Sequence, residues 1–280
     1  MPELTEVETL RRDLAAKLVG QRVREVHVLW PGSLRWCSPQ DFARYLEGQS
    51  ADVLSRRGKY LIFGLQGGGA LIFHLGMSGR LLLGAQGEEP GKHTRLILEF
   101  DGQRQLRFDD PRKFGRVCLV RDAEKVVGKL GPEPLGNEFS AEVLCSLLEG
   151  RSRRLKPLLL NQQFIAGLGN IYADEALFEA GLNPCMRACD LDKGEIARLC
   201  AAIKEVLERA LHNRGTTLSD RSYGDAYGRE GRNQEQLRVY GRAGQPCPRC
   251  GTAIQRITLE GRGAHFCPRC QRLKKEEKRG

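Results

Sequence analysis

The sequence lacks any apolar run close to the ~20 residues that a membrane-spanning helix needs, so an integral membrane protein is not expected. Its amino-terminal residues lead straight into charged sequence, without the apolar stretch of a secretory signal peptide. We therefore expect a cytoplasmic protein. Acidic residues are in deficit, with 35 Asp and Glu against 45 Lys and Arg, and the formal net charge is +10. This excess favours a polyanionic partner such as nucleic acid, although a basic protein without such a partner is the alternative.

The chain has 280 residues, of which 40% are hydrophobic and 29% charged, as is typical of a globular protein with one large domain or two ordinary ones. Ten cysteines would indicate disulfides in a small secreted protein. Without a secretory signal, a metal site accounts better for cysteines that occur in close pairs.

Two such pairs, Cys247/Cys250 and Cys267/Cys270, are CxxC motifs separated by 16 residues. A hairpin between them would bring four thiolates into one tetrahedral site, which suits Zn²⁺ better than iron. Because four protein ligands leave no position open for water, we expect one structural zinc ion. Two unrelated redox or structural pairs are the alternative.

The first half of the sequence predicts one helix, Thr5–Leu18, opened by a capping box of Thr5 and Glu8. Short strand-like runs separated by turn signals follow it, including a two-residue hairpin turn at Asp101-Gly102. The runs are Val23–Trp30, Tyr60–Leu65, Ala70–Leu75, Arg95–Phe100, Gln105–Phe108 and Arg116–Val120. An antiparallel sandwich or barrel is the simplest architecture for this half.

From about Gly131 the period becomes helical. The predicted helices are Ala141–Leu148, Leu155–Gln163, Tyr172–Ala180 and Lys193–His212. Residues 214–234 lose all periodicity and contain four glycines, which indicates a mobile loop before the cysteine pairs. We expect an α+β multidomain protein.

Pro2 is the most unusual candidate for chemistry. With Met1 removed, it presents a secondary amine of pKa near ~8, and its attack on a sugar C1′ gives a cationic iminium, the electron sink of an elimination. Glu3 beside it could act as general acid or base. Taken alone, an inconsequential Met-Pro-Glu start is the simpler reading.

Other segments suit contact with nucleic acid. Met77 follows a strand and could act as a wedge between bases, while Arg112 and Phe114 combine a cation and an aromatic in a tight turn. Lys59, which opens a strand after a basic turn, reads by itself as a surface lysine. For these residues a core methionine and an ordinary hairpin tip are the alternatives.

A glycine-rich turn at residues 167–170, preceded by Lys156, could expose backbone amides to a phosphate at a helix N-terminus. Arg262 lies between two glycines at the tip of the expected hairpin and is a further candidate phosphate contact. The alternatives are an ordinary helix–helix turn at residues 167–170 and a solvated side chain for Arg262.

Together these segments resemble the formamidopyrimidine-DNA glycosylase family, bacterial enzymes of base-excision repair, essentially from end to end and in order. The motifs that carry the resemblance are the segments 1–9 (MPELTEVET), 57–60 (RGKY), 74–79 (HLGMSG), 110–115 (DPRKFG), 130–134 (LGPEP), 169–173 (GNIYA) and 239–242 (VYGR), with the four cysteines.

The resemblance implies a β-sandwich domain with an N-terminal helix (1–130), a helix–two-turn–helix domain (131–236) and a zinc-finger hairpin with a basic tail (237–280). It implies that Pro2 forms the Schiff base, that Glu3 moves the proton for base loss, and that Lys59 and Arg262 assist β- and δ-elimination. The residues that it places on DNA are Met77, His93, Arg112, Phe114, Lys156 and Asn170. The loop around residues 216–234 would close over an oxidised purine in damaged duplex DNA, and a monomer would suffice for one lesion.

The chain departs from the family pattern at Thr5, usually proline, and at Ser152, often lysine. The Thr5 hydroxyl can cap the helix instead, and this departure bears on how rigidly Pro2 and Glu3 are presented. Near Ser152, Arg153 and its arginine neighbours could supply the charge. An endonuclease VIII-type glycosylase for oxidised pyrimidines and a non-catalytic zinc-containing DNA-binding protein are the competing interpretations.

Overall fold

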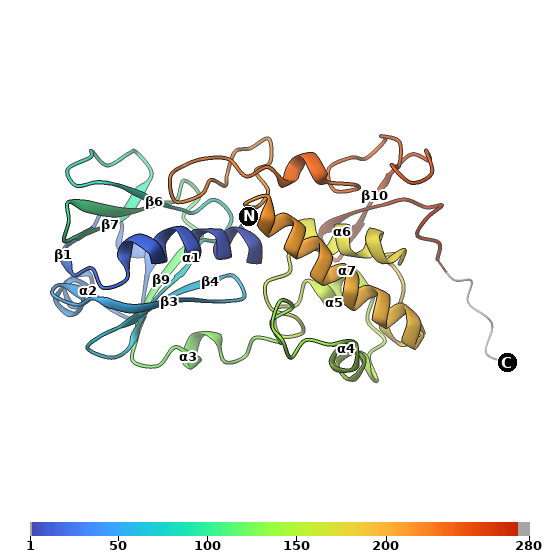
Figure 1. Cartoon of the computed structure of the whole chain (residues 1–280), viewed down its shortest axis with the longest axis horizontal. Coiled ribbons are helices and arrows are strands. Elements are labelled where there is room, and N and C mark those ends of the chain that lie inside the picture. The colour runs from blue at the N-terminus through green and yellow to red at the C-terminus, as the bar shows by residue number, and fades with distance from the viewer. Residues whose placement is uncertain (1, 274–280) are drawn as a thin grey trace. The chain divides into compact units, whose positions relative to one another are not determined.

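The computed structural model describes residues 2–273 and divides the chain into two compact units (Figure 1). The first unit comprises the residues up to Lys129 together with Ala210–Gln234. The second comprises Leu130–Arg209 and the residues from Glu235 on. Within residues 2–273, no helix has the length and apolarity needed to cross a bilayer.

Two sheets form the first unit. The four-stranded sheet has the order β1 (Val23–Val28), β7 (Thr94–Phe100), β8 (Arg104–Asp109), β6 (Arg80–Ala85). The five-stranded sheet has the order β2 (Leu34–Arg35), β9 (Arg116–Val120), β5 (Ala70–His74), β4 (Tyr60–Leu65), β3 (Ala51–Arg57). Neighbouring strands are antiparallel except β2 and β9, which are parallel. The predicted antiparallel sandwich is confirmed.

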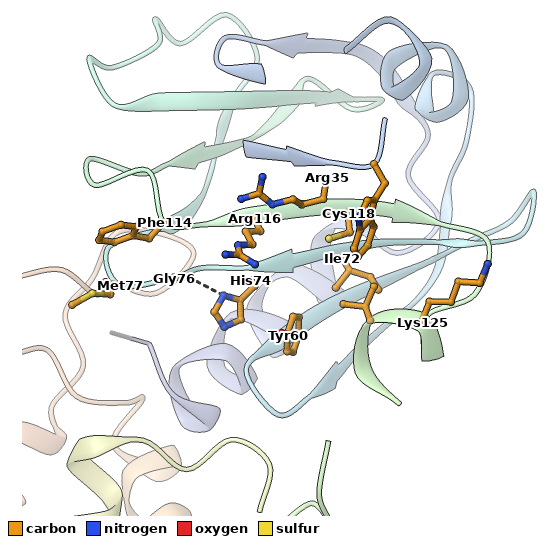
Figure 2. Close-up of a pocket in the computed structure, with 12 residues that line it drawn as sticks. Arg35, Tyr60, Ile72, His74, Gly76, Met77, Phe114, Arg116, Cys118 and Lys125 are labelled. Carbon is orange, nitrogen blue, oxygen red and sulfur yellow. Dashed lines mark hydrogen bonds between the residues drawn. The ribbon is translucent and has the colours of Figure 1, made fainter. Parts of the chain in front are cut away.

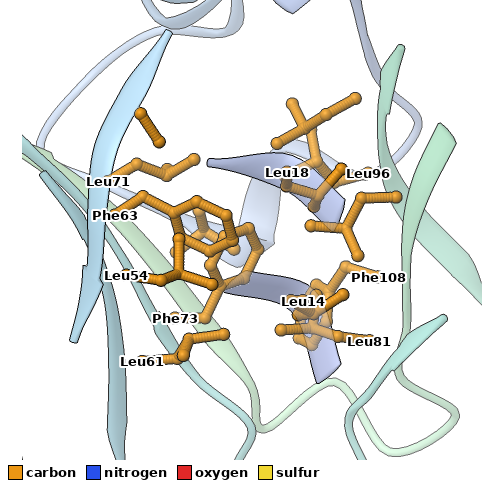
Figure 3. Packing of buried hydrophobic residues seen from close by; sticks show 14 of the residues in the cluster. Leu14, Leu18, Leu54, Leu61, Phe63, Leu71, Phe73, Leu81, Leu96 and Phe108 are labelled. Carbon is orange, nitrogen blue, oxygen red and sulfur yellow. The ribbon is translucent and has the colours of Figure 1, made fainter. Parts of the chain in front are cut away.

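The core lies between the sheets, because alternate strand residues face inward and helix α1 (Leu4–Leu18) adds an apolar stripe. Figure 3 shows Phe63 and Phe73 of one sheet facing Phe108 of the other, with Leu14 and Leu18 of α1 beside them. The ring centroid of Phe73 lies 5.7 Å from that of Phe63 and 5.8 Å from that of Phe108, both in edge contact. One face of α1 is therefore part of this core.

Several local expectations were wrong. The turn after β7 has three residues, 101–103, because Phe100 pairs with Arg104 and Gln103 adopts a positive φ of 58°. Three elements were not predicted from the sequence: β3, β6 and helix α2 (Pro39–Leu46). Strand β6 lies at the edge of its sheet and only Leu81 is buried, so its hydrophobic pattern is weak. The remaining short elements of this unit are the 3₁₀ helix Pro31–Ser33 and helix α3 (Glu124–Val127).

The second unit contains helices and one hairpin. Its elements are α4 (Ala141–Leu148), α5 (Leu155–Leu159), α6 (Asn170–Ala180), the 3₁₀ helices Ala188–Asp190 and Asn233–Gln236, and the strands β10 (Gln255–Leu259) and β11 (Arg262–Phe266). Helix α7 (Lys193–His212) begins in this unit and ends in the first. Helix α5 ends at Leu159, four residues before the predicted end at Gln163. The Gln162 side chain donates from Nε2 to Leu168 O and accepts at Oε1 from Gly167 N–H, and these two bonds hold the chain in a turn there.

The first prediction concerns the sandwich core. Because Phe73 is 0% exposed and touches aromatic rings of both sheets, Phe73→Ala should lower the free energy of unfolding by about 3–5 kcal/mol. Val53→Ala, at a residue of β3 that is 53% exposed, should cost less than about 0.5 kcal/mol. Urea denaturation measures both; equal losses would contradict the assignment of the core.

Candidate active site and nucleic-acid interface

The chain start is held by a buried carboxylate. Glu3, 1% exposed, is the N-cap of α1, and its backbone N–H donates to Glu6 Oε2 at 2.7 Å while its own carboxylate accepts from Glu6 N–H. This capping box is Glu3–Glu6, so the predicted Thr5–Glu8 box is wrong. The Thr5 hydroxyl instead donates to Glu6 Oε1 at 2.9 Å. The helix start therefore keeps its cap without proline, and Pro2 and Glu3 are fixed to a rigid helix.

Glu8 ties this helix to the strand that leads to Lys59. Its carboxylate accepts from Arg11 and Arg12 of α1 and, at 3.2 Å, from Arg56 Nε of β3. Arg56 also donates to Gly58 O, in the turn that carries Lys59. Lys59 is 6% exposed and not the surface lysine that its context alone suggested. Helix α1 and the Lys59 turn are thus parts of one frame.

Two turns interlock to present Met77 and Phe114. Gly76 has a φ of +63°, and a Cβ there would lie 2.6 Å from the backbone carbon of Phe114, so only glycine permits this approach. Buried Asp110 accepts hydrogen bonds from the Ser78 hydroxyl and from Gly115 N–H, both at 2.7 Å. Met77 and Phe114 remain 36% and 54% exposed. The fold therefore holds two apolar side chains rigidly toward solvent.

Arg112 and His93 lie near the same turns. The Arg112 guanidinium stands 5.5 Å over the Phe114 ring, and both Arg112 and His93 line a cavity of about 480 Å³ together with Met77. Arg221 of the loop before Gln234 also lines it. Cations and an exposed apolar wedge are what contact with a base stack and its phosphates requires.

A second cavity of about 480 Å³ is lined by Met77, Phe114 and His74 (Figure 2). Burial, with smaller contributions from Lys59 and Arg116, lowers the pKa of His74 from 6.5 to about 4. Its Nδ1 accepts a hydrogen bond from Gly76 N–H at 3.3 Å, so the proton of the neutral ring sits on Nε2. His74 is neutral near pH 7 and offers a hydrogen-bond donor there.

The aperiodic loop 214–234 is anchored within the first unit. Thr216 N–H donates to Glu6 Oε1 at 2.8 Å, which joins the loop to the start of α1. Asp225, 1% exposed, accepts from Arg214 at 2.7 Å and from Arg229 at 2.8 Å. Burial opposes ionisation of Asp225, but these bonds prevail and lower its pKa. The loop expected from composition is present, with defined attachments.

In the second unit, Lys156 is fully buried. Its ammonium contacts Asp174 Oδ1 at 2.6 Å and Gly263 O. Asp174 Oδ2 also accepts from His265 N–H at 2.9 Å and lies 3.0 Å from His265 Nδ1. Lys156 and Asp174 therefore hold the β10–β11 hairpin onto helices α5 and α6, next to Arg262.

The remaining candidates of this unit lie at element ends. Asn170 opens α6, and its Oδ1 is shielded from solvent without a hydrogen bond from any residue in 2–273. Arg262 opens β11 after a tight turn in which Glu260 and Gly261 have φ of 46° and 75°, and it is exposed. Arg153 forms an exposed ion pair with Glu260 in that turn. The hairpin predicted between the cysteine pairs is thus confirmed, with Arg262 near its tip.

The four paired cysteines converge. Their Sγ atoms all lie within 4.8 Å of one another, with 3.5 Å between Cys250 and Cys267 and 3.9 Å between Cys247 and Cys270. A tetrahedral zinc with bonds of about 2.3 Å requires sulfur–sulfur separations of about 3.8 Å. The donor set therefore fits one Zn²⁺ ion that is structural, because the four thiolates complete its coordination.

Three family models match the chain: the formamidopyrimidine-DNA glycosylase N-terminal domain over residues 1–117, the H2TH domain of the same enzyme over 130–222, and the zinc finger found in FPG and IleRS over 244–273. The chain belongs to the formamidopyrimidine-DNA glycosylase family. The finger match and the sulfur geometry together identify the four-cysteine cluster as its zinc site.

Relatives and solved structures agree with this membership. The formamidopyrimidine-DNA glycosylase of Moorella thermoacetica is 46% identical over 92% of this chain and 94% of its own length. The MutM (Fpg) protein of Thermus thermophilus is 45% identical, with a TM-score of 0.88 over 96% of this chain and 98% of its own. A Lactococcus lactis Fpg in complex with DNA that contains an abasic site is 36% identical, with a TM-score of 0.89 over 97% and 100%.

The sequence reading missed the acidic residues that position these groups: Glu6, Glu8, Asp110, Asp174 and Asp225. Asp110 begins the segment 110–115 (DPRKFG), but the sequence does not show that its carboxylate joins two turns. Glu6 gave a signal as the third residue after Glu3, the spacing of a capping box. The partners of Asp174, Lys156 and His265, lie too far away in the sequence to be predicted from spacing. Those of Asp225 lie in a loop that has no regular spacing.

The second prediction follows from His74. The unfolded chain takes up this proton near pH 6.5 and the folded chain only near pH 4, so the free energy of unfolding should fall as the pH drops through that window. The resulting loss in the free energy of unfolding reaches about 3 kcal/mol at about pH 4. Above pH 6.5 this loss is absent. His74→Gln should flatten the stability–pH curve there, whereas the exposed control His212→Gln should not. Urea denaturation at a series of pH values measures it, and unchanged curvature in His74→Gln would contradict the assignment.

The third prediction concerns zinc. Cys250→Ser removes one of four ligands and should reduce bound zinc from one ion per chain, and DNA affinity should fall with it because the hairpin that carries Arg262 loses its clamp. Cys189→Ser, at an exposed cysteine outside the cluster, should retain both. Metal analysis and binding titrations decide; full zinc content in Cys250→Ser would rule out the four-cysteine site.

Proposed function

We propose that the protein is a bifunctional DNA glycosylase and abasic-site lyase that removes oxidised purines, 8-oxoguanine and formamidopyrimidines, from duplex DNA. The observation that carries this proposal is the arrangement of Pro2 and Glu3 at the capped start of α1, within a chain whose family is shown by all three of its domains. Chemistry on a paired base requires its extrusion, and the rigid, exposed Met77 and Phe114 are suited to fill the space that it leaves.

In the proposed reaction the Pro2 nitrogen forms a bond to C1′ as the glycosidic bond breaks, and the departing base takes up a proton. Glu3, 1% exposed and next to the nucleophile, is placed to move that proton. The bound Pro2 nitrogen gives up its own proton, and the sugar ring opens as the C1′–O4′ bond breaks and O4′ takes up a proton, which leaves an iminium between the Pro2 nitrogen and C1′. This iminium acidifies C2′–H, so loss of that proton expels the 3′ phosphate. A second elimination expels the 5′ phosphate. We assign Lys59 to the first elimination and Arg262 to the second.

The DNA contacts follow from the geometry of each unit. Arg112 and His93 line the cavity beside Met77, and Asn170 opens a helix whose N-terminal amides favour a phosphate. For Lys156, full burial against Asp174 supports a role in holding the Arg262 hairpin. Arg153 contributes a charge near the same turn. We further propose that the enzyme acts as a monomer, in the bacterial cytosol where the chromosome lies.

The fourth prediction tests the chemistry. Glu3→Gln should slow excision of 8-oxoguanine by roughly 10²–10⁴-fold, as for loss of a general acid–base, yet borohydride should still trap it on a preformed abasic site because the Pro2 amine remains. Glu25→Gln, an exposed carboxylate of β1, is the matched control and should behave like the wild type.

The wild type supplies the remaining outcomes. A borohydride adduct that maps to Pro2, with Met1 absent by mass spectrometry, supports the nucleophile; Met1 itself lies outside the described residues. A preference for an oxidised pyrimidine over 8-oxoguanine would favour an endonuclease VIII-type enzyme. DNA binding without any adduct would leave only a DNA-binding protein.

A further inference from the structure

The cavity around His74 is not used by the proposed chemistry. It lies on the five-stranded sheet, with walls from β2, β4, β5 and β9 and a rim from α3 (Figure 2). Its volume of about 480 Å³ is in the range of small-ligand sites.

Its charge is of one sign. Arg35, Arg116 and Lys125 line the cavity, and no lining residue is acidic. Among the contacts within residues 2–273, none of the three cations forms an ion pair or a side-chain hydrogen bond. Neutral His74 adds a donor at Nε2. Unneutralised cations at the wall of a low-dielectric cavity favour an anion.

Two of these cations are fixed on neighbouring strands. In the parallel pairing of β2 with β9, Arg35 stands opposite Cys118, and Arg116 precedes Cys118 by two residues, so it shares the same face. Figure 2 shows the Arg35 and Arg116 side chains extending toward the same part of the cavity. Guanidinium groups so placed match the oxygens of one phosphate.

Trp36 adds a flat apolar surface to the same cavity. It is 73% exposed and adopts a φ of 65°, a conformation that non-glycine residues rarely take. Strain of this kind is concentrated at functional sites. An exposed aromatic ring beside cations is the arrangement that stacks a base while its phosphate is held.

Met77 and Phe114 line the cavity as well, so it adjoins the two side chains assigned to the DNA stack. We propose that it binds one nucleotide of the DNA strand that runs past Met77 and Phe114, with its phosphate on Arg35 and Arg116 and its base against Trp36. This subsite rests on the proposed function for its ligand, duplex DNA. It adds contacts outside the lesion and accounts for Trp36.

The fifth prediction tests the subsite with a duplex that contains a stable abasic-site analogue. The doubly substituted Arg35→Ala/Arg116→Ala protein should bind it more weakly, and the slope of log affinity against log salt should become less steep by about 0.9, since the subsite holds one phosphate and each phosphate contact contributes about 0.9. The exposed pair Lys17→Ala/Arg24→Ala, which lines neither cavity, removes the same charge as a control. In a Trp30→Phe background Trp36 is the sole tryptophan, so the fluorescence reports on this residue alone. Because a base is expected to stack on Trp36, the duplex should quench this fluorescence.

Borohydride trapping on an abasic site separates the two proposals, because Pro2 and Glu3 are intact in all of these proteins. An untrapped wild type would defeat the proposed function. A trapped wild type with equal salt slopes in the two double variants would defeat the subsite alone. Quenching of Trp36 by free deoxyadenosine monophosphate but not by the duplex would also overturn it, because the cavity would then bind free nucleotide.

Discussion

The carboxylate of Glu6 is the constraint on which the start of α1 and the position of the loop 214–234 depend. It accepts from the backbone of Glu3, from the Thr5 hydroxyl and from the backbone of Thr216. These donors belong to the chain start, the first turn of α1 and the aperiodic loop. Because a buried carboxylate is stable only when its lone pairs are satisfied, a displacement of the loop weakens the site that also orients Pro2. The position of the loop and the position of Pro2 at the start of α1 are therefore coupled through one group.

Other acidic side chains of the first unit also join segments that are distant in the sequence. Glu8 joins α1 to the strand before Lys59, and Asp110 fixes the turn that presents Phe114. In each case a short acidic side chain receives donors from segments far apart in sequence. A mobile aromatic side chain loses rotamer and backbone entropy when a binding partner fixes it, and the rigid turn removes much of that cost beforehand.

The sequence predicted what depends on spacing and composition. The CxxC pairs predicted the zinc site, the long periodic run predicted α7 at its observed ends, and short strand-like runs between turn signals predicted β4 and β9 at theirs. It did not predict β6, whose exposed edge weakens the pattern, or the short α5, which a side-chain amide terminates. Nor could it show that Lys59 is buried, because that depends on α1 packing across β3. The sequence predicted which residue types make up the site. Their hydrogen-bond partners became visible only in the folded structure.

The excess of basic residues acquires a structural meaning from where the acids lie. Asp174 and Glu175 are adjacent on α6 and both buried; Asp174 holds Lys156, and Glu175 accepts from the backbone of residues 238–240. Burial raises the pKa of Glu175, and only those backbone donors allow a carboxyl group in this position. Acids engaged inside the protein cannot neutralise cations at its surface. Arg35, Arg116 and Arg262 therefore keep their charge available, and the field that attracts a polyanion arises from the same interactions that hold the turns in place.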